Sequence, residues 1–348
     1  MSIPYRTRRT LNRVGTVAAI ALVLFLIGWI CWVVWLQRYV VFTDDGAKLD
    51  FEHSANEIIG EIPVPPAAAQ NVSIYFNEGA DAINVSNDMT QLSGYYIDVN
   101  MLKGGIDELI LQLERLDSGT AIMVDMDGPQ GSSFYNTKLA GGVVSSSMDV
   151  NAIARLLQTM ENKGFYTIAR ISAFQDYYFG LNNVPAGLMH ISRKGLWPDG
   201  NTYWLDPTSP TTTNWIASQV LELRDMGFDE VLLDQFWFPN SNQYIFNGDK
   251  NAALQSAAST LVASCGASNF VLSFHTGNAT FVPPEGRTRL YVSGISATGI
   301  NQAASQTAFK EPAIQLVFLA ESGDTRYDEY SVLRTITVAE EVEARKAG

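Results

Sequence analysis

The residue most able to do chemistry is Asp234, which ends an apolar run in the stretch GFDEVLLDQFWFP at residues 227–239. A buried carboxylate is costly unless it is paired or hydrogen-bonded. Asp234 is therefore either a structural group, such as a helix cap or an ion-pair partner of Arg170, or a functional one. We favour function, with Gln235 and Trp237 beside it as ligand contacts.

Further charged residues close other apolar runs in the same way. Asp125 and Asp127 are two positions apart, so on an extended strand their side chains point the same way. Their repulsion would raise the pKa of one of them, as acid–base chemistry requires, or they simply share a solvated opening. The remaining charged candidates are Asp98, Arg170 and Asp176. For Arg170 we favour pairing with the acidic groups over direct substrate contact.

Aromatic residues are frequent in the stretches that follow these runs: Trp197, Trp204, Trp237, Tyr177, Tyr178 and Tyr244. Aromatic rings stack on the apolar faces of sugars, and carboxylates and amides bind the sugar hydroxyls. For Trp204 we favour anchoring of a loop to the core. His275, in SFHTGN, is a weaker candidate, because a lone histidine is more often structural.

The elements that must position these residues are short apolar strands that alternate with amphipathic helices. In residues 106–113, for example, Ile106, Leu109, Ile110 and Leu113 recur with helical spacing. Helices are also expected in residues 151–160, 214–226, 251–265 and 331–346. Seven strands are predicted, at about 94–99, 120–126, 164–171, 228–234, 270–274, 289–294 and 313–319. An eighth would be VSIYF at 72–76 or lie within 295–310.

Continuous apolar strands separated by helices predict a parallel sheet that is covered on both faces. About 255 residues of this pattern, without a glycine-rich phosphate motif, favour a (β/α)8 TIM-like barrel over a doubly wound sheet. In such a barrel the strand ends form one functional rim, which would gather the candidates above.

The N-terminal part predicts a membrane anchor. Residues 17–36 form a run of 20 residues without a charge, long enough to span a bilayer. Four arginines precede it, so the N-terminus is expected in the cytoplasm and the rest outside the cell. A cleaved signal peptide is the alternative, although the run is long and no small-residue cleavage site follows. The expected organisation is a basic tail (1–16), a transmembrane helix (17–36), a stalk with a small β segment (37–92) and a barrel domain (93–348).

Charge and composition exclude several classes of partner and cofactor. The whole chain has a formal net charge of −13, and its first 38 residues hold five arginines and no acid, which leaves −18 for the remainder. Such a domain repels nucleic acid. Cys31 and Cys265 predict no intrachain disulfide, and three scattered histidines predict no metal site. No cofactor is expected.

Four motifs resemble the glycoside-hydrolase TIM barrels catalogued as domain of unknown function 4015, which occur in bacterial exported and membrane-anchored proteins. IMVDMDGPQG is similar to the family's VIDVKDDxG on strand two, and FYTIARISAFQD to IYVIARIVAFKD on strand three. A WLDP turn and GFDEVLLDQFWFP, similar to GFDEIQFDYIRFP, follow in the same order. The resemblance covers residues 93–240. It departs where Asp127 replaces a lysine and where Gln235 and Trp237 replace a tyrosine and an arginine.

The resemblance implies a glycoside hydrolase with Asp234 as the nucleophile at the end of strand four. Two carboxyl groups are normally needed, and strands five and six end without an acid. The proton donor is therefore expected to be Glu321, with Asp324, Asp125 or Asp127 as substitutes. The expected substrate is a polysaccharide or oligosaccharide of the cell wall or an exopolysaccharide. The alternatives are a non-catalytic glycan-binding or scaffolding barrel and, more remotely, a metal-dependent deacetylase. The sequence does not identify a protein partner.

Overall fold

The computed structural model describes residues 29, 40–43, 46–49, 89–128 and 130–336. The chain divides into two compact units, Met1–Ala80 and Asp81–Gly348. In the first unit, strands β1 (Val40–Thr43) and β2 (Gly46–Leu49) pair antiparallel, with Thr43 opposite Gly46. This confirms the prediction of β structure in YVVFTDDGAKLDF.

Within the part of the chain that the structure describes, no helix is long and apolar enough to cross a membrane. The anchor predicted at residues 17–36 lies outside the described residues except for Trp29, as does the candidate strand at 72–76. Both stay predictions.

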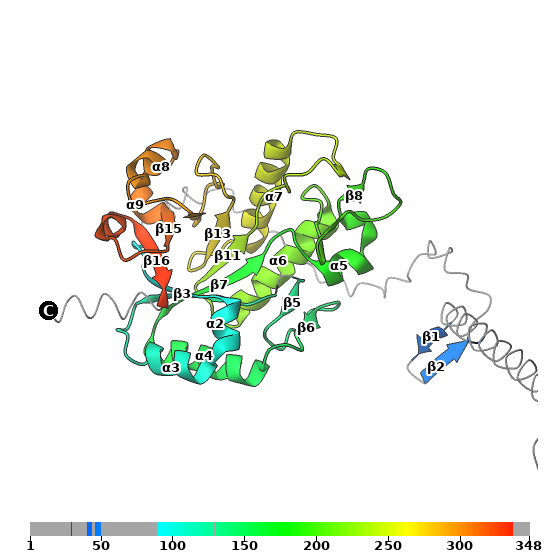
Figure 1. The fold of residues 1–348 in the computed structure, drawn as a ribbon, viewed down its shortest axis with the longest axis horizontal. Coiled ribbons are helices and arrows are strands. Elements are labelled where there is room, and N and C mark those ends of the chain that lie inside the picture. Colours follow the sequence, from blue (N-terminus) through cyan, green and yellow to red (C-terminus); the bar gives the residue numbers. More distant parts are fainter. Residues whose placement is uncertain (1–28, 30–39, 44–45, 50–88, 129, 337–348) are drawn as a thin grey trace, which may run out of the picture. The chain divides into compact units, whose positions relative to one another are not determined.

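The second unit is built on eight parallel strands that close into a barrel (Figure 1), as the sequence predicts. Each barrel strand pairs with the barrel strand that follows it along the chain, and the last barrel strand pairs with the first. In order, the strands are β3 (Ser93–Ile97), β4 (Ala121–Asp125), β7 (Tyr166–Ser172), β11 (Glu230–Asp234), β13 (Val271–His275), β14 (Leu290–Ser293), β15 (Leu316–Ala320) and β16 (Ser331–Thr335).

The eighth barrel strand is β16, a segment that the sequence assigned to a helix. Residues 295–310, the other suggested location, hold helix α8 (Ile300–Gln306) instead. The sequence SVLRT has the period of two that a strand requires, since Leu333 joins the interior of the barrel while Val332 packs outside it. An arginine within this short stretch hides the apolar run that identified the other strands.

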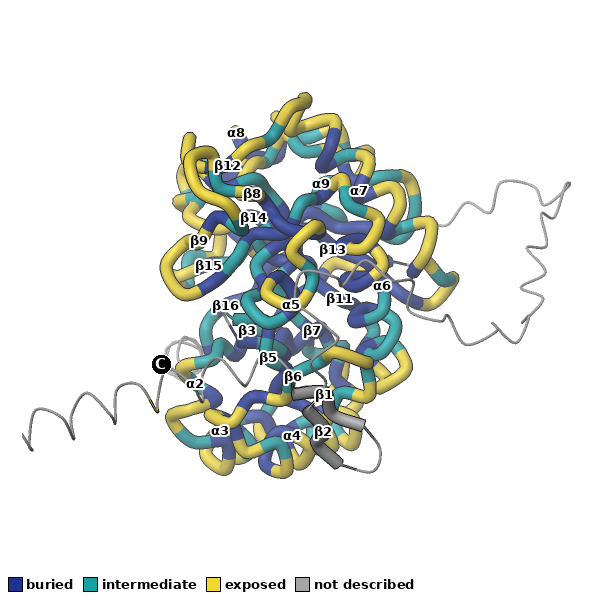
Figure 2. Tube along the Cα trace, turned by 90° about the vertical axis from the view of Figure 1, so that its right-hand side faces the viewer, coloured by how far each residue is buried: buried dark blue, intermediate teal, exposed yellow. Residues whose placement is uncertain are grey.

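Helices cover the outside of the barrel, and buried residues run through its centre (Figure 2). The helices expected from sequence at 106–113, 151–160, 214–226 and 251–265 are present as α3 (Ile106–Leu113), α4 (Val150–Lys163), α6 (Pro210–Asp225) and α7 (Lys250–Cys265). Two connections depart from a regular (β/α)8 pattern. A loop without a helix joins β13 to β14, and only a 3-10 helix (Thr325–Glu329) separates β15 from β16.

The interior of the barrel is packed with side chains from alternate strand positions. The buried members of this inner cluster are Leu92, Ala121, Met123, Ile168, Leu232, Tyr291, Val317 and Leu333. Their neighbours along each strand point outward to the helices. The inner cluster fills the barrel below its carboxyl-terminal rim, so only side chains at the rim are left to meet a ligand.

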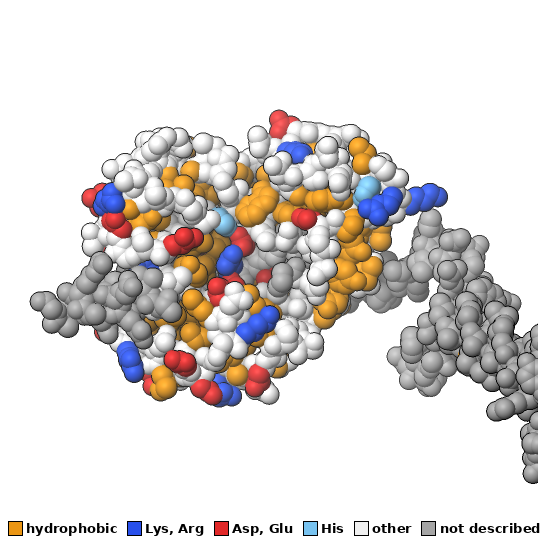
Figure 3. Space-filling view, in the orientation of Figure 1, with side chains coloured by type: hydrophobic (Ala, Val, Ile, Leu, Met, Phe, Trp, Pro, Cys, Tyr) orange, Lys and Arg blue, Asp and Glu red, His pale blue; other side chains and the backbone are white. Residues whose placement is uncertain are grey.

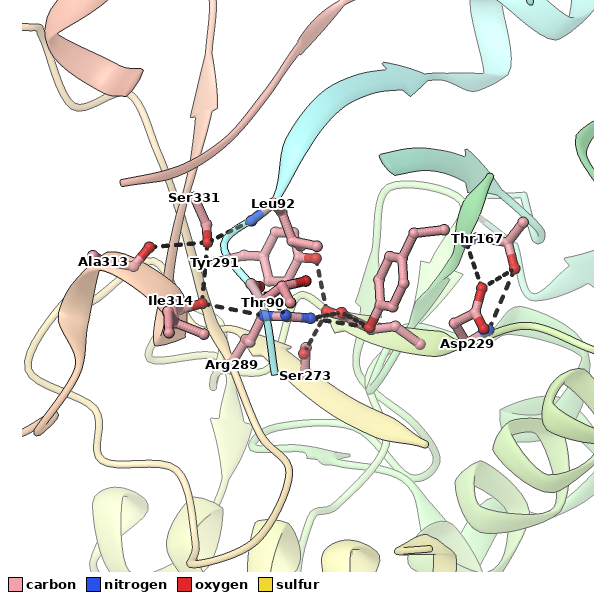
Figure 4. A network of polar contacts seen from close by, with 12 residues as sticks. Thr90, Leu92, Thr167, Asp229, Ser273, Arg289, Tyr291, Ala313, Ile314 and Ser331 are labelled. Atoms are coloured by element: carbon pink, nitrogen blue, oxygen red, sulfur yellow. Dashed lines mark hydrogen bonds and ion pairs between the residues drawn. The ribbon is translucent and has the colours of Figure 1, made fainter. Parts of the chain in front are cut away.

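A buried polar network closes the amino-terminal end of the barrel (Figure 4). The carboxylate of Glu230 is paired with Arg289 and accepts hydrogen bonds from the hydroxyls of Tyr166, Ser273 and Tyr291 at 2.9, 2.6 and 2.7 Å. Arg289 also donates to two backbone carbonyls, those of Thr90 and Ile314. Because every charge here is paired, the network is compatible with complete burial and ties four strands together.

Candidate active site

Strand geometry brings five polar side chains to the inside of the carboxyl-terminal rim. Each lies two positions beyond an inward residue of its own strand, and side chains two apart share a face. Strand pairing places Asp125 opposite Arg170, with Asp234 one strand further on. The five are Asp125 on β4, Arg170 on β7, Asp234 on β11, His275 on β13 and Ser293 on β14.

Arg170 bridges the two carboxylates at the centre of this rim. Its Nε and Nη2 donate to Oδ2 of Asp234 at 3.0 and 2.6 Å, and its Nη1 donates to Oδ1 of Asp125 at 3.2 Å. Because Oδ2 of Asp234 and Oδ1 of Asp125 bind the same planar guanidinium, they lie closer together than roughly 9.5 Å, the upper limit for the two carboxyl groups of a glycoside hydrolase. The structure therefore brings together three of the residues that the sequence singled out.

The second oxygen of Asp234 is held from the other side. Oδ1 lies 2.5 Å from Nδ1 of His275 and accepts a hydrogen bond from the backbone amide of Gln235 at 2.8 Å. With the two bonds from Arg170, all four acceptor positions of this carboxylate are occupied. The far nitrogen of His275, Nε2, lies 3.0 Å from the hydroxyl of Ser293.

The environment separates the acidities of the two carboxyls. Burial alone would raise the pKa of Asp234, but the hydrogen bond from His275 and the charge of Arg170 outweigh it and lower the pKa to about 2. Burial raises the pKa of Asp125 to about 6, against the charge of Arg170 and the hydrogen bond from the Val99 amide. Near neutral pH, Asp234 is ionised and Asp125 keeps a protonated fraction.

Asp127 and Gln235 contact the same residue of β7. Asp127 accepts from the Ser172 amide at 2.9 Å, and burial raises its pKa well above the usual range. Gln235 accepts from the Ser172 hydroxyl at 2.8 Å. Its φ of 54° is the only positive φ of a non-glycine residue in the described chain, so the backbone turns sharply immediately after Asp234.

Asp98 and Glu321 lie at the rim but outside the Arg170 bridge. Asp98 caps helix α2 (Val99–Gly104) by accepting from the amides of Asn100 and Met101. Glu321 is exposed and, among the described residues, forms no hydrogen bond or ion pair. Both charges act on Tyr96, whose pKa is raised by burial first and then by Glu321 and Asp98.

Asp176 lies in the loop after β7, where both of its carboxylate oxygens make structural contacts. It caps helix α5 (Tyr177–Asn182) through a bond from the Phe179 amide at 2.8 Å, and its other oxygen accepts from Nε1 of Trp215 at 3.0 Å. Burial raises its pKa to about 7. The sequence suggested a ligand contact for this loop residue, because its position after the strand does not reveal that the side chain turns toward helix α6.

Three of the six loop aromatics, Trp197, Trp204 and Tyr244, are buried in the protein. Trp204 is buried and donates to Asp199 at 2.8 Å, in keeping with the anchoring expected for it. Trp197 is buried against Tyr244, with ring centroids 5.3 Å apart. Trp237 is half-buried and lies edge-on to His275, with ring centroids 5.7 Å apart, so it stays at the rim.

Two grooves flank the charged cluster. One, of about 780 Å³, is lined by Val99, whose amide binds Asp125, and by polar side chains including Gln130, Gln175 and Asn201. The other, of about 420 Å³, is lined by Trp237, Phe238 and Thr276, and the ring of Trp237 lies edge-on to His275. The five polar rim side chains themselves line neither groove. Figure 3 shows acidic and basic side chains and a histidine gathered in a hollow of this face, with apolar side chains beside them.

Sequence reasoning missed Ser293 and Ser172. Serine is common at strand ends, so residue type alone gives little signal. The available clue was the position of Ser293 at the end of a predicted strand, directly before a glycine in YVSG. No group of three or more metal-binding side chains occurs among the described residues.

The comparisons with known proteins agree with this architecture. Residues 96–267 match the family model of domain of unknown function 4015, described as "Putative glycosyl hydrolase domain". The resemblance predicted from the four motifs is thereby confirmed over these residues. Among curated proteins, none matches the sequence.

Several solved structures are similar in fold. A hypothetical protein from Ruminiclostridium thermocellum is 20% identical and aligns over 52% of this chain and 96% of its own, with a TM-score of 0.45. The GH36 α-galactosidase AgaA from Geobacillus stearothermophilus is 9% identical over 74% of this chain, with a TM-score of 0.50. The alignment spans only 40% of AgaA, so the likeness shows the barrel fold alone.

Proposed function

Because residues 96–267 match the model of a glycosyl hydrolase domain, we propose that the protein hydrolyses glycosidic bonds. Asp234 is the ionised carboxylate, and Asp125 is the proton donor. The observation that carries the proposal is a pair of carboxyl groups bridged by one arginine, whose environments shift their pKa values in opposite directions, to about 2 for Asp234 and about 6 for Asp125. Such a separation assigns the roles of acid and base in a carboxyl pair.

The reaction needs one proton and one anionic group on opposite sides of the bond. Asp125 gives its proton to the glycosidic oxygen as the bond to the sugar breaks. Asp234 either bonds to the anomeric carbon, after which water that gives its proton to Asp125 breaks that bond and releases the sugar, or takes a proton from the attacking water. Arg170 keeps Asp234 ionised and stabilises the negative charge that Asp125 acquires when its proton leaves.

This assignment prefers Asp125 to Glu321 as the acid. Asp125 is joined to Asp234 through Arg170, whereas Glu321 is exposed and outside that bridge. A raised pKa is what a general acid requires near neutral pH, and burial of Asp125 supplies it.

The grooves support a carbohydrate ligand. Their walls combine aromatic rings with amide and hydroxyl side chains, a mixture that suits sugar rings and their hydroxyls. With the uncharged run at residues 17–36 as a membrane anchor and the barrel outside the cell, the substrate would be a cell-wall glycan or an exopolysaccharide.

One observation favours a second function, that of a glycan-binding barrel without catalysis. All four acceptor positions of Asp234 are occupied, so the carboxylate must release a hydrogen bond before it can act on a substrate. A barrel that only binds glycans needs no such release.

A single experiment separates the two functions. The full chain is tested on a glycan array and on a panel of the same glycans for hydrolysis, beside Asp234→Asn, Asp125→Asn and Asp107→Asn as an exposed control. Hydrolysis that is lost in the first two variants and kept in the third is the expected result. Binding without turnover in the unmodified chain would replace the hydrolase with the binding barrel.

A further inference from the structure

Asp234, His275 and Ser293 form a line of hydrogen bonds across three neighbouring barrel strands. Oδ1 of Asp234 lies 2.5 Å from Nδ1 of His275, and Nε2 of the same ring lies 3.0 Å from Oγ of Ser293. β11 pairs with β13, and β13 with β14, so the backbone itself sets this alignment. The glycosidase mechanism above uses neither Nε2 of His275 nor Ser293.

The three side chains differ in exposure: two are buried, and the third is open to solvent. Asp234 and His275 are only 7% exposed, whereas Ser293 is exposed. Gly294 follows with φ 70°, so the chain turns away as soon as the strand has delivered Ser293 to the rim. The hydroxyl is therefore the member of the line that a substrate can reach.

The contacts also assign the protons on the imidazole. Asp234 is an acceptor, because it is ionised and already binds Arg170 and the Gln235 amide. Nδ1 of His275 therefore carries the hydrogen, and Nε2 is left to accept the proton of the Ser293 hydroxyl. Trp237 lies edge-on to the ring at 5.7 Å between centroids and restrains its orientation.

We propose that Ser293 is a nucleophile for acyl transfer, with His275 as its general base and Asp234 as the positioning residue of that histidine. The geometry is that of an activated serine, a group suited to the cleavage of carboxylic esters. The acyl donor would be an ester of a sugar hydroxyl. That the alcohol part of the ester is a sugar rests on the proposed function, whereas the cleavage of an ester by Ser293 does not.

The reaction balances without a cofactor. Oγ of Ser293 bonds to the ester carbonyl carbon while its proton passes to Nε2 of His275. The bond from that carbon to the sugar oxygen breaks, and the oxygen takes the proton from Nε2. Water then attacks the acyl-serine, gives a proton to Nε2 and releases the carboxylic acid as Oγ regains that proton. The products are a free sugar hydroxyl and one carboxylic acid.

The test uses the full chain with two probes, 4-nitrophenyl acetate as the ester and a fluorophosphonate as the serine-directed label. Variants are Ser293→Ala and, as a matched control on the same loop, Ser296→Ala, whose hydroxyl bonds Thr298 instead. Circular dichroism checks folding. We expect the label on the peptide that contains Ser293, and loss of ester hydrolysis by at least roughly 100-fold in Ser293→Ala only.

An unlabelled Ser293, or an unchanged rate of ester hydrolysis in Ser293→Ala, would overturn the inference. Glycoside hydrolysis is measured on the same preparations, which keeps the two proposals apart. Ester cleavage through Ser293 without any glycoside cleavage would leave this inference standing and remove the proposed function. Glycoside cleavage without labelling would do the reverse.

Discussion

Arg170 donates two hydrogen bonds to a single oxygen of Asp234, from Nε at 3.0 Å and from Nη2 at 2.6 Å. The other oxygen is left to His275 and to the backbone. Asp234 therefore belongs to two sets of hydrogen bonds. On the side of β7 it shares Arg170 with Asp125, and on the side of β13 it binds His275, which contacts Ser293.

Removal of the arginine charge should move the acidic limb of the activity profile. In Arg170→Gln the pKa of Asp234 rises, because the opposing charge and its hydrogen bonds are lost while the burial remains. Activity at low pH should then fall off at a higher pH than in the unmodified chain. The measurement is kcat/KM against pH, and an unshifted acidic limb would show that Arg170 does not set the ionisation of Asp234.

The alkaline limb should belong to Asp125. Since the acid must be protonated and its pKa is about 6, kcat/KM should rise above a pH of about 2 and decline above about 6. Asp125→Asn should abolish activity on natural glycans, whose leaving groups need the proton, but spare a 4-nitrophenyl glycoside, whose leaving group does not. Glu321→Gln is the matched comparison and should leave the decline in place.

Stability should fall as pH rises from about 4 to about 7. The folded pKa values of Asp125 and Asp176, about 6 and about 7, exceed the unfolded value of ~3.9, so the stability linked to their protonated forms is lost through this range. Asp234 acts in the opposite sense, because its pKa is lowered to about 2 and its contribution is lost only in stronger acid. Urea unfolding at a series of pH values measures this slope, which should be shallower in Asp176→Asn.

The network at the amino-terminal end of the barrel should matter for stability rather than activity. Arg289→Ala leaves Glu230 buried without its partner, which typically costs about 3–5 kcal/mol. Arg155→Ala, which breaks the exposed pair with Asp107, should cost about 1 kcal/mol or less. Equal losses of unfolding free energy in the two variants would contradict the role assigned to the buried network.

The sequence predicts the barrel and the centre of its rim because both follow from local patterns. Asp125, Arg170 and Asp234 close apolar runs whose strand ends must meet at one edge. The sequence does not reveal the features that depend on closure of the barrel or on the direction of a side chain. The eighth strand is recognisable only by its pairing with β3 and β15, and Ser293 only by the strand pairing that aligns it with His275. The structural contacts of Asp176 are also hidden from the sequence, because its bond to Trp215 spans 39 positions of the chain.

The most direct test of the central claim is the rate of glycoside hydrolysis by Asp234→Asn on the best glycan of the panel, with Asp107→Asn as the exposed control. The variant is nearly isosteric but lacks the charge that Arg170 and His275 maintain. We predict a loss of at least roughly 1000-fold in kcat for Asp234→Asn, with folding retained and the control unaffected. Hydrolysis by Asp234→Asn at the rate of the unmodified chain would contradict the account.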